Sequence, residues 1–146
     1  MKHKLFTFIL ALTASVGTLF AEIGTCGDNL TWDLTDSVLT ISGTGVMKDY
    51  DYYNKRYAPW YSSRQSIRTV TISDGVTSIG SYAFYYCDRL RSVAIPNSVT
   101  SIGTFAFRYS NISTIKFTGS IAEWCNKNWF PEKFLGITRC ISKVFQ

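Results

Sequence analysis

One short sequence occurs twice in this chain, and it constrains the fold more than any other feature. Residues 78–84 read SIGSYAF and residues 101–107 read SIGTFAF, so the two copies lie 23 residues apart. Apolar residues before each copy repeat at the same spacing, and a third, partial copy follows 22 residues on. A period in the twenties is typical of solenoids, whose units bury their apolar sides only by stacking. The matched positions are Ile67/Leu90/Ile112, Val70/Val93/Ile115, Ile72/Ile95/Phe117, Val76/Val99/Ile121, Ile79/Ile102, Gly80/Gly103, Ala83/Ala106 and Phe84/Phe107.

Each unit opens on an alternating segment that predicts a half-buried strand, namely IRTVTIS, LRSVAIP and ISTIKFT. The inward side chains would be Val70, Ile72, Val93, Ile95, Ile115 and Phe117. The opposite, open face would carry Thr69, Thr71, Ser92, Ala94, Thr114 and Lys116. Turns at Asp74-Gly75 and Pro96-Asn97 would then carry the chain back beneath the coil. Gly80 and Gly103 are expected where the backbone bends sharply or packs closely.

The pattern L-x-x-V-x-I-P-x-x-V-x-x-I-G-x-x-A-F-x-x-C resembles the leucine-rich repeats of the BspA-like bacterial surface proteins, and residues 67–121 fit it. Residues 24–50 and 58–80 resemble the segment that often precedes those repeats, and FTGSIAEWCN (117–126) resembles the element that often closes them. The resemblance covers about four fifths of the chain. It implies a mostly β fold, a short leucine-rich-repeat solenoid of about three repeats. It also implies a non-catalytic interaction or adhesion role at a bacterial cell surface or outside the cell.

The flanking segments are expected to cap the exposed ends of so short a stack. Leu30, Trp32 and Leu34 alternate, TDS turns the chain, and Leu39 and Ile41 alternate back, which predicts a β-hairpin at the N-terminal edge. After the repeats, Ser120 followed by Glu123 predicts the start of a short helix. An apolar lid would be formed there by Ile121, Trp124, Trp129, Phe130 and Phe134. The expected domains are 1–21 signal peptide, 22–66 hairpin cap and aromatic loop, 67–121 repeats and 122–146 C-terminal cap.

The first 21 residues have the pattern of a secretory signal peptide: Lys2 and Lys4, an apolar run, and a small residue at Ala21. A membrane anchor is the alternative, although the apolar run is shorter than the roughly 20 residues that a span needs. A lipoprotein cysteine at Cys26 is a second alternative, although EIGTC matches the required small-residue box poorly. Cleavage after Ala21 predicts a secreted or cell-surface bacterial protein without a membrane span.

Cleavage would also limit the chemistry of the mature chain. The sequence holds one histidine, His3, which would leave with the signal, so Ser-His-Asp, Cys-His and histidine-ligated metal sites are excluded. Loss of Lys2 and Lys4 lowers the formal net charge from +5 to +3, too little to indicate nucleic acid. The carboxylate pairs Asp49/Asp51 and Glu123/Glu132 could be imagined as a glycosidase pair, but chance pairs are common. We therefore expect no catalytic residue, metal or cofactor.

The aromatic loop YDYYNKRYAPWY is the best candidate for ligand binding, through Tyr50, Tyr52, Tyr53, Tyr57, Trp60 and Tyr61. Such rings can anchor a protein partner or stack on sugar faces. The alternative is that Trp60 and one or two tyrosines pack over the first repeat. A second set, Tyr82, Tyr85, Tyr86 and Tyr109, is expected on the outer surface of the repeat turns.

Three functions therefore remain open. The first is contact with an extracellular protein or matrix partner, the second is carbohydrate binding through exposed aromatics, and the third is a structural repeat fragment without a ligand. The open strand face is a further candidate surface, but its small side chains offer few anchors. Of the four cysteines, Cys87 is expected to be a buried small side chain, whereas Cys125 and Cys140 could pair as a disulfide in the C-terminal cap.

Overall fold

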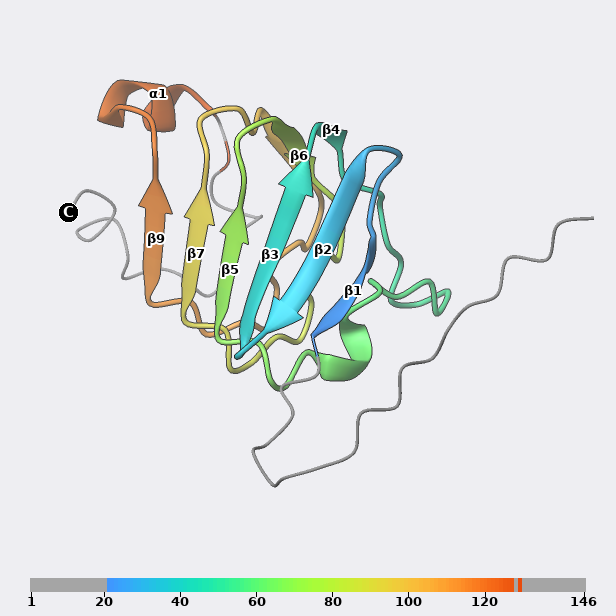
Figure 1. The fold of residues 1–146 in the computed structure, drawn as a ribbon. Coiled ribbons are helices and arrows are strands. Elements are labelled where there is room, and N and C mark those ends of the chain that lie inside the picture. The colour runs from blue at the N-terminus through green and yellow to red at the C-terminus, as the bar shows by residue number, and fades with distance from the viewer. Residues whose placement is uncertain (1–20, 128, 130–146) are drawn as a thin grey trace, which may run out of the picture.

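The computed structural model describes residues 21–127 and residue 129. They form a six-stranded sheet with strand order β1-β2-β3-β5-β7-β9, a three-stranded sheet with order β4-β6-β8, one α-helix (α1) and one 3-10 helix (η1) (Figure 1). The proposed signal peptide lies outside these residues except for Ala21, as do Phe130, Glu132, Phe134 and Cys140. The elements are β1 Glu22–Thr25, β2 Leu30–Thr35, β3 Val38–Gly43, β4 Gly45–Val46, η1 Tyr61–Ser63, β5 Thr69–Ile72, β6 Val76–Ile79, β7 Ser92–Ile95, β8 Ser101–Ile102, β9 Thr114–Phe117 and α1 Ile121–Asn126.

The predicted N-terminal hairpin is confirmed. Strands β2 and β3 pair antiparallel, and the two residues between them, Asp36 and Ser37, have φ values of 50° and 67°. Two consecutive left-handed residues are the mark of a type I′ turn, whose twist suits a two-residue hairpin. The hairpin does not form the edge of the sheet, however. Strand β1 pairs antiparallel with β2 and occupies that edge, which the sequence pattern did not predict because β1 is short and its side chains are mostly exposed.

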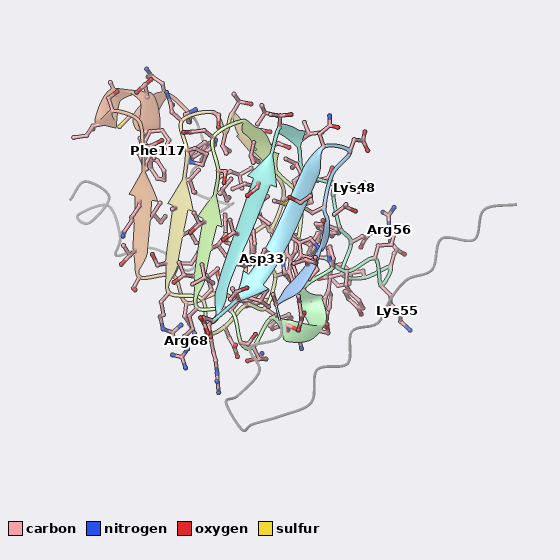
Figure 2. The ribbon with its side chains drawn as sticks, viewed as in Figure 1. Asp33, Lys48, Lys55, Arg56, Arg68 and Phe117 are labelled. Carbon is pink, nitrogen blue, oxygen red and sulfur yellow. The ribbon has the colours of Figure 1, made fainter. Side chains whose placement is uncertain are left out.

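The repeats stack as parallel strands, and their register reproduces the sequence period. Val70 pairs with Val93, and Val93 pairs with Ile115, so matched residues of successive repeats lie side by side. Strand β3 joins this ladder with Leu39 opposite Val70. The second strand of the hairpin is therefore the first rung of the parallel part, and the cap is continuous with the solenoid. Figure 2 shows Arg68 at the edge where these strands begin, and Phe117 toward the opposite edge.

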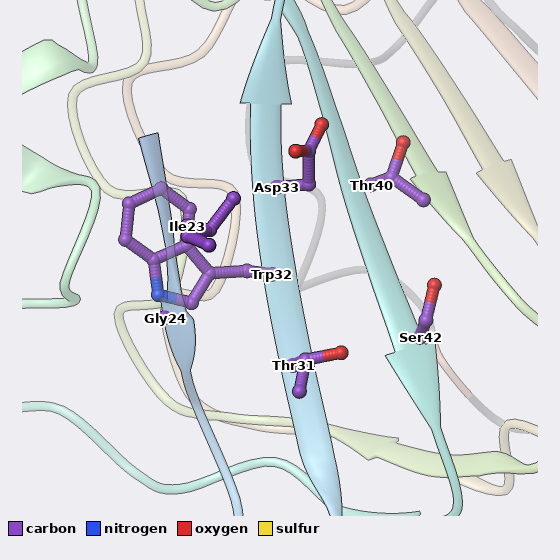
Figure 3. A pocket seen from close by; sticks show the side chains of 7 residues that line it. All are labelled: Ile23, Gly24, Thr31, Trp32, Asp33, Thr40 and Ser42. Atoms are coloured by element: carbon purple, nitrogen blue, oxygen red, sulfur yellow. The ribbon is translucent and has the colours of Figure 1, made fainter. Parts of the chain in front are cut away.

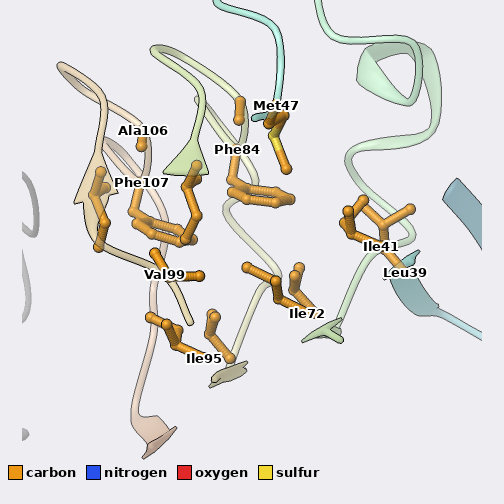
Figure 4. Close-up of a cluster of buried hydrophobic side chains, with 14 of the residues drawn as sticks. Leu39, Ile41, Met47, Ile72, Phe84, Ile95, Val99, Ala106 and Phe107 are labelled. Atoms are coloured by element: carbon orange, nitrogen blue, oxygen red, sulfur yellow. The ribbon is translucent and has the colours of Figure 1, made fainter. Parts of the chain in front are cut away.

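The inward positions of the repeats form the core (Figure 4). All six predicted inward residues of the strands are buried, and so are the alanine and phenylalanine of each SIGxxAF copy. The rings of Phe84 and Phe107 stack with centroids 5.0 Å apart, and Trp60 stacks on Phe84 at 5.6 Å. Trp60 thus occupies the phenylalanine position of a preceding half-coil, 24 residues before Phe84.

The return segments are strands as well, which the sequence pattern did not predict. β6 pairs with β8 in parallel, and Ser78 lies opposite Ser101. Adjacent coils approach closely here, as expected for Gly80 and Gly103. A Cβ on Gly80 would collide with the backbone carbonyl of Lys48, and one on Gly103 would collide with the backbone of Ser81. These glycines are therefore required by packing between coils.

The predicted C-terminal helix is confirmed as α1, with a complete capping box between Ser120 and Glu123. Trp124 and Trp129 are buried, and their ring centroids lie 5.1 and 5.9 Å from that of Phe117. The expectation that Ile121 continues the third repeat and joins the lid is wrong. Its side chain is 59% exposed, because the chain enters α1 there instead of a third return strand.

Candidate functional site

The open face of the six-stranded sheet is lined by small side chains, as the alternation predicted. Thr69, Thr71, Ser92, Ala94 and Thr114 are half-buried along β5, β7 and β9, and Lys116 is exposed. An open hollow of about 550 Å³ lies on the N-terminal part of this sheet (Figure 3). Ile23 and Trp32 line it together with small or polar residues, and the Asp33 carboxylate accepts a hydrogen bond from Thr35 Oγ1 at 2.9 Å. This face offers little area to anchor a partner.

The aromatic loop divides into buried and surface rings. Trp60 is fully buried, and its indole Nε1–H donates to the Ala83 carbonyl at 2.8 Å. Tyr50 is partly buried and packs on Trp60, with centroids 6.0 Å apart. Trp60 therefore offers no ring face to a ligand, which corrects its inclusion among the candidate binding residues. Trp60, with Tyr50 beside it, instead packs over the first repeat, which is the alternative that the sequence left open.

The remaining loop tyrosines contact the tyrosines of the repeat turns, although the sequence pattern indicates two separate sets. Tyr52 is the centre, with ring centroids 4.8 Å from Tyr85, 5.8 Å from Tyr86 and 5.9 Å from Tyr57. Nine rings from the loop and two repeats form one connected network, which we call the aromatic surface. Its members are Tyr52, Tyr53, Tyr57, Tyr61, Tyr82, Tyr85, Tyr86, Phe105 and Tyr109.

Exposure differs strongly within the aromatic surface. Tyr53 is 73% exposed, and Tyr57, Tyr86 and Tyr109 lie near 40–46%. Tyr85 is buried beneath them at 5%. The crevice between the loop and the first turn has no room for a water molecule, whereas small-molecule pockets begin at roughly 300 Å³. The aromatic surface is therefore a broad contact area rather than a pocket.

Four members of the aromatic surface have left-handed backbone conformations. Tyr82 and Phe105 have φ 54°, while Tyr86 and Tyr109 have φ 58° and 61°, so each repeat places two aromatic residues in this region. A bulky side chain there is a conformational outlier, and an L-residue pays about 1–2 kcal/mol for it. Stacking of Tyr86 on Tyr109, at 4.7 Å and 22°, recovers about 0.5–1.5 kcal/mol. Each repeat turn therefore places aromatic side chains at the surface in a backbone conformation that lowers the stability of the fold.

Arginines lie directly on these rings. The Arg108 guanidinium lies 4.6 Å from the centroid of Phe105 and 5.0 Å from that of Tyr109, within cation–π range. Arg64 lies 4.1 Å above Tyr61. Arg56 forms an exposed ion pair with Asp51 at 3.5 Å. Arginine and tyrosine together are the residue types most enriched in protein hot spots.

The phenol groups of Tyr82 and Tyr85, both in the aromatic surface, have pKa values above the ordinary value. Partial removal from water raises the pKa of Tyr85, and the neighbouring hydroxyls of Tyr53, Tyr86 and Tyr109 raise it further. The pKa of Tyr82 is also raised, first by desolvation and then by Tyr53 and Asp51. Neutral phenols can donate hydrogen bonds, so at neutral pH this surface presents O–H donors beside a permanent cation.

The candidate carboxylates take part in local structure. Asp49 Oδ1 accepts a hydrogen bond from the backbone N–H of Ser81 at 2.7 Å. Asp51 accepts hydrogen bonds from Asn54 Nδ2 and from two backbone N–H groups, which holds the pKa of its carboxyl below the usual value. Glu123 serves the helix cap. Within residues 21–127 and 129, no three His, Cys, Asp or Glu side chains gather as a metal site requires.

The cysteines follow the predicted pattern where they are described. Cys87 is buried, and burial raises the pKa of its thiol to about 12. Cys26 is buried as well, with a thiol pKa raised to about 11 by desolvation. Cys125 is exposed on α1, and its proposed pairing with Cys140 stays a prediction because Cys140 lies outside the described residues.

No helix in the described part of the chain is long and apolar enough to cross a membrane.

The chain is similar to known leucine-rich repeat proteins in both sequence and structure. A family model described as BspA type leucine rich repeat region matches residues 57–134, starting at the aromatic loop. A crystal structure of a leucine-rich repeat protein from Eubacterium ventriosum is similar, with a TM-score of 0.63 and 35% identity over 68% of this chain. The match covers 26% of that protein, so this chain spans about a quarter of its length. A search of curated proteins gives no match.

Proposed function

Because this chain belongs to the BspA-type leucine-rich repeat family, a class of protein-interaction repeats, we propose that it is a secreted or cell-surface bacterial protein that binds an extracellular protein. The contact would be made by the aromatic surface, without catalysis or cofactor. Adhesion to matrix, host or another microbe is the role that this activity would serve.

The connected rings of the aromatic surface are the observation that carries the proposal. Residues from the loop and from two repeats combine into one exposed area, and Arg108 lies on its rings. Large, rigid aromatic side chains gain contact area at a low cost in side-chain entropy, and arginine adds directed hydrogen bonds. Exposed apolar patches of this kind mark interaction sites on soluble proteins.

Secretion is supported by the position of the first strand. Strand β1 begins at Glu22, directly after the proposed cleavage point at Ala21. Cleavage there would keep β1 whole, including the hydrogen bonds from Ser63 Oγ to the Glu22 carboxylate at 2.7 and 2.8 Å. The mature chain would therefore keep its full N-terminal edge.

Carbohydrate binding is the second candidate, and the exposure of Tyr53 is the observation that favours it. A ring that is 73% exposed has a face on which a sugar could stack. Against it, Tyr57 is stacked on Tyr61 at 4.3 Å and Tyr86 on Tyr109 at 4.7 Å, so each of these rings has one face already covered.

The proposal is tested by capture. The secreted chain is immobilised and challenged with a panel of purified matrix and serum proteins, and in parallel with a glycan array. We expect a protein to be retained, and Tyr53→Ser or Tyr109→Ser to weaken its binding by about tenfold or more.

Thr71→Ala and Thr114→Ala on the open sheet face are the matched controls and should bind as the natural chain does. Retention on glycans alone would favour the carbohydrate candidate. Loss of binding in the open-face variants, with the tyrosine variants unaffected, would move the site to the sheet.

A further inference from the structure

The chemistry around Arg108 identifies the kind of partner. Arg108 occupies the repeat position that Tyr85 fills one coil earlier, so the two repeats differ here. Its guanidinium lies above the rings of Phe105 and Tyr109. The Tyr85 ring lies 5.5 Å from the Tyr109 ring, and the hydroxyls of Tyr53 and Tyr109 help to raise the pKa of the Tyr85 phenol. A guanidinium and several O–H groups therefore converge on one part of the aromatic surface.

The charge balance at this surface is positive. Lys55 and Arg56 are exposed on the loop that borders it, as Figure 2 shows at the side of the molecule away from β9. Asp51 is the acid of this loop, and its carboxylate is occupied by Asn54 and Arg56. Among the described residues, Asp51–Arg56 is the one ion pair, so Lys55 and Arg108 keep their charge uncompensated.

The backbone supports an outward role for these rings. Tyr86 and Tyr109 are 39% and 46% exposed and have left-handed φ values. Glycine or asparagine would accept the same conformation more readily. Aromatic rings at strained, exposed positions are better explained by contact with a partner than by folding.

We propose that the aromatic surface binds an acidic segment of its protein partner, with carboxylates on Arg108 and the neighbouring tyrosine hydroxyls. Lys55 and Arg56 border the segment. This inference rests on the proposed function and adds the chemistry of the partner. A peptide suits the surface better than an anionic glycan, because the stacked pairs Tyr57–Tyr61 and Tyr86–Tyr109 leave few ring faces for sugars. Carboxylates on arginine form short, directed hydrogen bonds that fix register.

The experiment uses the secreted chain and an array of short peptides rich in Asp and Glu. Each peptide has a counterpart in which Asn and Gln replace the acids, and heparin and neutral glycans form separate arms. We expect acidic peptides to bind, and their amide counterparts to bind about tenfold more weakly or worse. Binding should weaken as NaCl rises from about 50 mM to about 500 mM, because salt screens exposed charges.

Arg108→Gln is the decisive variant and should lower affinity for acidic peptides by about tenfold. Arg68→Gln is the matched control, since it removes the same charge from an exposed residue just before β5, and it should have no effect. Equal losses in both variants would indicate non-specific charge attraction and overturn the proposal. Binding to heparin but not to peptides would overturn it in favour of a glycan.

Tyr86→Asn provides a second readout, because asparagine accepts the left-handed conformation. We expect an unchanged or higher melting temperature together with weaker peptide binding. A clear fall in melting temperature with peptide binding retained would show that the ring supports the fold, against the proposal. If replacing the acids of the peptides by amides has no effect while Tyr53→Ser still abolishes partner capture, the acidic segment is refuted and the proposed function stands.

Discussion

The open face of the sheet and the aromatic surface belong to the same repeats, yet they are built in opposite ways. On the sheet, Thr71 lies opposite Ala94 and Ala94 opposite Lys116, with small side chains on a regular parallel ladder. At the turns, matched positions carry Tyr85 and Arg108, and rings stand at strained backbone angles. Regular strands need only side chains that keep the coils in register. Specific contact requires large side chains that differ from coil to coil.

The largest expected difference in stability lies within one turn, between the buried ring of Phe107 and the exposed ring of Tyr109. Phe107 is 1% exposed and stacks on Phe84, whereas Tyr109 is 46% exposed. Phe107→Ala should lower the free energy of unfolding by about 3–5 kcal/mol, because it leaves a cavity in the stack. Tyr109→Ala should cost less than about 1 kcal/mol, because a ring that is 46% exposed leaves no buried cavity when it is removed. Urea denaturation measures both, and similar losses would contradict the division between core and contact rings.

The close approach of coils at the turn is tested by Gly103→Ala. The added Cβ would meet the backbone of Ser81 and the carbonyl carbon of Gly80, neither of which can move aside easily. We expect a loss of about 1–3 kcal/mol in the free energy of unfolding, as for other overpacked sites. Thr71→Ala on the open face should stay within about 0.5 kcal/mol. A neutral Gly103→Ala would show that the turns are looser than the sheet.

A smaller effect concerns Cys87, which lies beneath the aromatic turn. Its thiol pKa is about 12 in the folded chain against an ordinary value of 9.0. The unfolded chain therefore loses this proton first, and stability should fall as pH rises from about 9 toward 12. With reductant present, the natural chain should lose roughly 1 kcal/mol more between pH 8 and pH 10 than Cys87→Ala does. Equal losses in the two chains would show that the thiol is not shielded.

Much of the fold could be predicted from the sequence, because the same pattern of buried positions occurs in two copies. The period predicted the inward residues, the stacking of the units and the packing glycines. The short hairpin and the Ser120 helix cap carry local signals that need no tertiary information. The exposed edge strand β1 and the short return strands carry no such signal. Ile121 was misjudged because an apolar residue at the first turn of a helix is indistinguishable, in sequence, from one that continues the repeat.

The candidate site was predicted only in part. The loop tyrosines and the turn tyrosines were both recognised, but the period says nothing about how residues before the repeats fold against them. Trp60 was the signal that could have joined the two sets. It lies 24 residues before Phe84, close to the repeat spacing, and so places the loop as a half-coil beside the first turn. Arg108 was visible as a difference between repeats, but its position over Phe105 and Tyr109 depends on left-handed turns that the sequence does not reveal.

Footprinting of the bound complex tests most directly that contact is made by the aromatic surface. The chain is oxidised by hydroxyl radicals with and without its captured protein partner, and side-chain modification is read by mass spectrometry. We expect protection of Tyr53, Tyr57, Tyr86 and Tyr109, with unchanged modification of Lys116 and the rest of the open sheet face. Protection of the open sheet face, with the four tyrosines modified as in the free chain, would contradict the account.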